Sequence, residues 1–178
     1  MTKFKPQIGK GSFGSGLANL LITIGDTKTA DKAFNEYFSS RFYSKYTGID
    51  LLLSTVAVRE LTANKYDGRL FIDINLISPS DIYITYDGVH DKKTIDNFVE
   101  LYMQEKQDNK IMPLTSRTYK KYPTIQILEH IKYFGGHAVV ALNDKSYIDY
   151  GQKCSQIELE KKGRIVEPVA YIDVITQP

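Results

Sequence analysis

Apolar residues recur every three or four positions in the first third of the chain, a spacing that predicts helices. A glycine-rich loop runs into Leu17-Ala18-Asn19-Leu20-Leu21, and Gly25-Asp26 then ends this first helix. Thr27 or Thr29 can cap a second helix, and a third is expected from about residue 49 to 61. The apolar positions of the second helix are Ala30, Ala33, Phe34, Tyr37 and Phe38.

Short runs of β-branched and aromatic residues follow, each beside a turn signal, and they predict strands. A further helix is expected from Thr94 to Lys106, whereas the stretch bounded by Pro113 and Pro123 receives no assignment. The Tyr-Asp-Gly triplets at 66–68 and 86–88 are expected to be turns, and 143–145 a hairpin turn. The expected strands span residues 70–74, 82–86, 124–131, 137–142, 146–150 and 169–175.

Helices that precede an antiparallel sheet are typical of the α+β class. A chain of 178 residues fits one domain and can bury a proper core. We therefore expect a single domain with a helical part at about 1–65, a mixed middle at about 66–122 and a sheet part at about 123–178.

The composition is that of an ordinary globular protein, with 42% hydrophobic and 25% charged residues. A net charge of +2 without a basic stripe gives no support to a nucleic-acid partner, so none is expected. The run Glu160-Lys161-Lys162 is interpreted as solvated surface. The oligomeric state stays open at this level.

The single cysteine, Cys154, excludes an intramolecular disulfide and zinc sites built on several thiolates. The first residues are not followed by a long apolar segment with a cleavage site, and the apolar run Leu17 to Ile24 is too short to span a bilayer. We therefore expect a cytoplasmic protein with no membrane partner.

The opening segment Ile8-Gly9-Lys10-Gly11-Ser12-Phe13-Gly14 resembles the glycine-rich loop of protein kinases, whose backbone amides close over phosphates. The other kinase motifs are missing in order, and the nearest approach to the lysine strand, Val56-Ala57-Val58-Arg59, ends in arginine. A dinucleotide-binding loop fits less well because Pro6 leaves little room for a preceding strand. Glycines that only shape a tight loop are the third interpretation.

His137 begins an apolar strand directly after Gly135-Gly136, and Asp149 lies on the next expected strand. Period-two alternation can place both side chains near the same end of a hairpin, where the carboxylate would hold the imidazole in one tautomer. A purely structural histidine is the alternative. His90 and His130 have no companion segment of this kind, and no spacing supports a metal site, so neither metal nor cofactor is expected.

Together, Gln7, Ser12 with the helix after it, and Gly136-His137-Ala138-Val139-Val140 with Asp149 resemble the papain-like cysteine peptidases. The likeness is greatest to the bacteriocin-processing, double-glycine group. The separation of 125 residues between positions 12 and 137 (137 minus 12) is compatible with the roughly 130 to 150 of papain-like enzymes.

The resemblance implies a papain-like fold, with N-terminal helices packed on a C-terminal antiparallel sheet. It also implies hydrolysis of an amide or acyl bond in a peptide or protein substrate. It makes His137 the general base and Asp149 its orienting partner. Gln7 and the backbone N–H of Ser12 would bind the oxyanion.

Ser12 departs from the family, because the nucleophile there is cysteine and a hydroxyl is much harder to deprotonate than a thiol. Three interpretations remain: an engineered Cys-to-Ser change, a natural pseudoenzyme that only binds peptide, and a genuine serine variant. Ser15 is a second choice of nucleophile. Cys154 follows His137 and would reverse the order of the residues.

Overall fold

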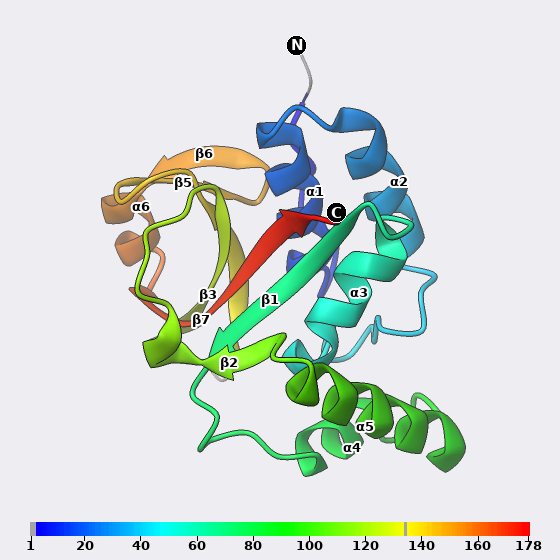
Figure 1. Ribbon diagram of the computed structural model, residues 1–178. Coiled ribbons are helices and arrows are strands. Elements are labelled where there is room, and N and C mark those ends of the chain that lie inside the picture. The colour runs from blue at the N-terminus through cyan, green and yellow to red at the C-terminus, as the bar shows by residue number, and fades with distance from the viewer. Residues whose placement is uncertain (1–2, 134) are drawn as a thin grey trace.

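The computed structural model describes residues 3–133 and 135–178, and it has the expected α+β architecture (Figure 1). The strands in the described residues are β1 (Tyr66–Ile72), β2 (Ile111–Pro113), β3 (Thr124–His130), β4 (His137–Ala141), β5 (Ser146–Asp149), β6 (Gln152–Ser155) and β7 (Arg164–Thr176). They form one sheet in the order β2-β1-β7-β3-β4-β5-β6. Neighbouring strands are antiparallel, except that β1 and β2 are parallel.

Most helices lie together on one side of this sheet, and the last one lies on the other side, beside β5 and β6 (Figure 1). The helices are α1 (Ser12–Thr23), α2 (Thr27–Tyr37), α3 (Ser54–Leu61), α4 (Ser80–Tyr86), α5 (Lys92–Gln107) and α6 (Gln156–Lys161), with short 3-10 turns η1 (Leu51–Leu53) and η2 (Leu114–Ser116). The main core lies between the sheet and α1 to α5. A smaller core lies between the opposite face and α6.

Strand β4 contributes to both cores because successive side chains of a strand point to opposite faces. Ala138 and Val140 belong to the main core under the helices, whereas Val139 and Ala141 pack with Leu159 of α6. His137 therefore shares the α6 face of β4. Asp149 shares that face of β5, because Val140 pairs with Ile148 in the register.

The prediction of a strand at residues 82–86 is wrong, because this segment lies in helix α4. Ile82 and Tyr86 are fully buried, whereas Ile84 between them is 75% exposed. A spacing of four between buried residues suits one helix face. The β-branched and aromatic content of this segment therefore misled the prediction, and packing of the 82 and 86 side chains decided the outcome.

Other boundaries also differ from the expectations. Helix α1 begins at Ser12, five residues before Leu17, and the triplet at 66–68 is the start of β1 and not a turn. The structure adds β2, β6 and α6, which the pattern did not predict, and β7 begins at Arg164. Of these, β2 pairs with β1, which is distant in sequence, whereas β6 pairs with the preceding β5, and α6 contacts its chain neighbours β6 and β7.

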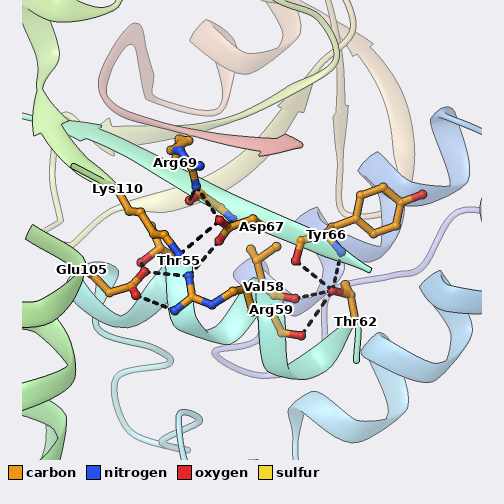
Figure 2. Close-up of polar contacts among 10 residues, drawn as sticks. Thr55, Val58, Arg59, Thr62, Tyr66, Asp67, Arg69, Glu105 and Lys110 are labelled. Atoms are coloured by element: carbon orange, nitrogen blue, oxygen red, sulfur yellow. Dashed lines mark hydrogen bonds and ion pairs between the residues drawn. The ribbon is translucent and has the colours of Figure 1, made fainter. Parts of the chain in front are cut away.

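A buried charge network joins α3, α5 and β1 beneath the helices (Figure 2). Arg59 donates to Asp67 at 2.7 Å and to Glu105 at 2.9 Å, and Thr55 donates to Glu105 at 2.6 Å. Burial opposes ionisation of Asp67, but Arg69 and Arg59 outweigh it and lower its pKa to about 2. The stabilisation from Asp67 is thus complete above its unfolded pKa of about 3.9 and is lost as the pH falls towards 2.

Replacement by alanine is expected to have opposite effects on stability at two glycines of α1. A Cβ at Gly14 would lie 2.3 Å from Cδ1 of Tyr37, which is fully buried, whereas one at Gly16 would meet only ordinary contacts from 3.6 Å. Gly14→Ala should destabilise by about 1–3 kcal/mol through overpacking. Gly16→Ala should stabilise by about 0.5–1 kcal/mol through helix propensity. Urea unfolding of both variants measures this, and effects of the same sign would contradict the packing.

Candidate active site

A groove of about 1450 Å³ is lined by residues of both the helical part and the sheet, among them Gln7, Ser12 and His137. Residues 45–52, Asp81, Ile84 and Thr85 line it from the helical part, and Ile127, Gly136 and Tyr150 line it from the sheet side. Its volume exceeds the roughly 300–1,000 Å³ of typical small-molecule sites, so it has room for an extended chain segment. Two segments far apart in the chain, one with Gln7 and Ser12 and the other with His137, therefore line one cleft.

Ser12 is the first residue of α1, where backbone N–H groups have no partner within the helix. The preceding residue, Gly11, makes no side-chain cap and the first turn holds no acid, so the positive end of the helix stays uncompensated. The N–H of Ala138 donates to the Ser12 Oγ at 3.3 Å. This amide would stabilise negative charge on Oγ, and it places the hydroxyl beside the backbone that follows His137.

His137 and Asp149 form a buried pair in which Nε2 and Oδ1 are 2.6 Å apart. They are 6% and 2% exposed. Burial opposes the charge on Asp149, but the contacts with His137 and Lys162 outweigh it and hold its pKa below the usual range. An ionised carboxylate can only accept, so Nε2 donates, and in the neutral ring Nδ1 is then free to take a proton.

Gln7 lies on the groove in the segment that leads to α1. Its Nε2 donates to the carbonyl of Gly9 at 2.9 Å, a bond that fixes the side-chain amide. An amide nitrogen carries two hydrogens, so the second remains for an oxygen in the groove. Gln7 and the amides at the start of α1 are therefore suitable donors for an oxyanion.

Close packing explains why glycine stands at position 136, before His137. A Cβ at Gly136 would lie 2.3 Å from Cγ2 of Ile127, so only glycine allows β4 to begin this close to β3. In the turn that follows β5, Gly151 has φ +76° and a Cβ there would lie 2.8 Å from the carbonyl of Lys5. Both ends of the His137 and Asp149 hairpin thus depend on close backbone approach.

The site also includes Tyr150 and Lys162, two residues that the sequence did not indicate. The ring of Tyr150 stacks on His137 at 5.1 Å between centroids, with Tyr150 itself at φ +49°. The Nζ of Lys162 lies 3.3 Å from Oδ2 of Asp149 and 5.2 Å from the Tyr150 ring centre. Lys162 is solvated surface as expected, with its side chain 47% exposed, and the turn after α6 also brings its Nζ to the carboxylate.

The alternative nucleophiles are placed elsewhere. Ser15 is buried, and its hydroxyl donates to the carbonyl of Lys5 at 2.9 Å and accepts from Asn19. Cys154 lies in β6, and burial and the nearby Asp149 raise the pKa of its thiol. Of the three candidates, only Ser12 lines the groove.

The other two histidines have structural partners. The ring of His90 bonds to the carbonyl of Arg41 at 2.7 Å and packs edge-on against Phe98. His130 lines the groove, but its Nδ1 accepts from the N–H of Lys132, so its Nε2 must donate to the carbonyl of Lys162. Both ring nitrogens of His130 are thus engaged by the backbone.

The kinase-like motif does not form a phosphate loop. Gly14 and Gly16 are buried inside α1, and the segment Val56 to Arg59 belongs to helix α3. Arg59 is already bound to Asp67 and Glu105. The nucleotide-binding interpretation thus lacks both its loop and its lysine strand.

Within residues 3–133 and 135–178, no helix is long and apolar enough to cross a membrane. Over the same residues, no three His, Cys, Asp or Glu side chains are grouped in a way that could hold a metal ion.

In comparisons with known proteins, no family model, no curated protein and no solved structure matches this chain.

Proposed function

We propose that this protein is a papain-like hydrolase of an amide or acyl bond in a peptide or protein, with Ser12 in the place of the nucleophile. The observation that carries the proposal is the meeting of Gln7, Ser12 and His137 in one groove, with Asp149 bonded behind the histidine. The same four residues carry the likeness to the bacteriocin-processing peptidases in the sequence.

In the proposed reaction, the Ser12 Oγ attacks the carbonyl carbon of the substrate and its proton passes to Nδ1 of His137. The carbonyl oxygen becomes an oxyanion that Gln7 and the free amides at the start of α1 stabilise. His137 then gives the proton to the leaving amine and the C–N bond breaks. Water then attacks the carbonyl carbon of the acyl-enzyme and gives a proton to His137. The bond between that carbon and Oγ breaks, and His137 returns the proton to Oγ, which restores the hydroxyl.

Serine and cysteine differ in when the nucleophile loses its proton. A thiol at a helix N-terminus can ionise before the substrate arrives, whereas a hydroxyl loses its proton only during attack, to a neutral imidazole. The donor at Ala138 eases this step because it favours negative charge on Oγ.

A fluorophosphonate probe, which phosphonylates activated serines, tests the proposal on the unmodified chain. We expect one label per chain at Ser12, lost in Ser12→Ala and in His137→Ala. Ser15→Ala is the matched control and should label normally, because the Ser15 hydroxyl is buried against Lys5. Intact mass and peptide mapping give the readout.

The second candidate is a non-catalytic peptide-binding protein on the same frame, which the serine at position 12 favours. Absence of labelling, together with saturable binding of a peptide library that is lost on filling the groove by Thr47→Trp, would favour it. A label that persists in Ser12→Ala would contradict both candidates.

A further inference from the structure

Lys162 shares the Asp149 carboxylate with His137. Oδ1 is 2.6 Å from Nε2 of the histidine, and Oδ2 is 3.3 Å from Nζ of the lysine. Each oxygen thus has its own cationic or donor partner. Asp149 is 2% exposed, so the contact with His137 is shielded from water, whereas the Lys162 side chain is 47% exposed and meets the carboxylate from the solvent side.

The backbone holds Lys162 in place from both sides. Its N–H donates to the carbonyls of Glu158 and Leu159 at 3.2 and 3.1 Å, and its own carbonyl accepts from His130 at 2.9 Å. Gly163 has φ +84°, and a Cβ there would lie 2.5 Å from Nε2 of His130. The turn is therefore fixed against β3.

The charge of Lys162 acts on the histidine through the carboxylate. A buried, unbalanced Asp149 would favour the imidazolium form of His137, whereas an ammonium on its other oxygen offsets that charge. We propose that Lys162 is a positioning residue that balances Asp149 and keeps His137 neutral, the form that a serine nucleophile requires. The role assigned to Lys162 rests on the proposed function, but the titration that tests it does not.

Other groups around His137 stay constant in the comparison described next. The Tyr150 ring covers one face of the imidazole, and its hydroxyl accepts from Arg164 at 3.3 Å. The remaining charged or titratable residues that line the groove are Lys10, Lys45, Tyr46, Asp50, Asp81, His130 and Tyr133. Since none of them changes, a difference between lysine variants reports Lys162 alone.

The test is an NMR titration of the His137 ring, assigned by the signal lost in His137→Gln. Lys162→Met should raise the pH at which the ring is half-protonated by about 0.5–1 unit, as expected for loss of a nearby opposing charge. Lys161→Met is the matched control, with the same charge change one residue away, and should shift it by less than about 0.2 unit. Lys162→Arg should stay close to the parent.

The fluorophosphonate rate gives a second readout. Lys162→Met should label about 3–10-fold more slowly near pH 6 and at the parent rate near pH 9, because only the protonated fraction changes. Equal titrations in Lys162→Met and Lys161→Met would overturn the inference while leaving the hydrolase proposal intact. A chain that never labels, but whose ring titrates as expected, would overturn the hydrolase proposal and retain the charge balance.

Discussion

Replacing Ser12 with cysteine is expected to create a thiol that reacts with peptidyl chloromethyl ketones at neutral pH. The position offers the uncapped start of α1 and the neighbouring His137, and both lower the pKa of a thiol. In this background His137→Ala should slow labelling by about 10²–10⁴-fold, the usual contribution of a positioned base. The second-order rate of alkylation, followed by intact mass, measures the effect.

The controls follow from the other residues of the chain. Cys154→Ser in the same background removes the one native thiol, whose reactivity should be low because burial raises its pKa. His90→Gln removes a histidine that bonds to Arg41 and should leave the rate unchanged. If labelling of the position-12 thiol were equally fast with and without His137, the two residues would not form a catalytic pair, and the papain-like proposal would fail.

Glu105→Gln is expected to cost about 3 kcal/mol of unfolding free energy. The value is at the lower end of the roughly 3–5 kcal/mol for breaking a buried ion pair, because Asp67 still offsets part of the Arg59 charge. Glu60→Gln is the matched control, since Glu60 also pairs with an arginine but is 46% exposed at its side chain. It should cost less than about 1 kcal/mol. Urea unfolding followed by circular dichroism compares the two.

A double variant separates the charge effect from packing. Arg59→Met with Glu105→Leu replaces both partners by apolar side chains, and it should recover much of the stability lost in Glu105→Gln. If the double variant were less stable than the single one, Arg59 would matter chiefly to Asp67 and β1, and the α3 to α5 pair would not be the main contribution.

Four buried side-chain atoms have no hydrogen-bond partner among the described residues: the Tyr37 hydroxyl, the Gln126 Oε1, the Gln7 Oε1 and the Arg164 Nε. We have no physical account of the first two, which lie outside the groove lining. Gln7 and Arg164 line the groove, and the Gln7 side chain is held there by its bond to the Gly9 carbonyl.

Local periodicity was enough for the α+β class and for most elements. The second helix and α5 follow from apolar spacings of three and four, and the hairpin of His137 and Asp149 follows from two short alternating runs with Asn143 in the turn. The residues concerned are close in sequence, so backbone geometry alone limits where their side chains can point. The pairing of this histidine with this aspartate is therefore the part of the site that the sequence determined best.

Tertiary structure decided what depends on distant neighbours. Helix α4 forms where a strand was expected because Ile82 and Tyr86 are buried together, and α1 reaches back to Ser12 because Gly14 packs closely against Tyr37. Lys162 reaches Asp149 only because the turn after α6 ends beside it. Such contacts depend on how whole elements pack, and their free energy comes from burial and charge pairing in the folded state, which no short window of sequence contains.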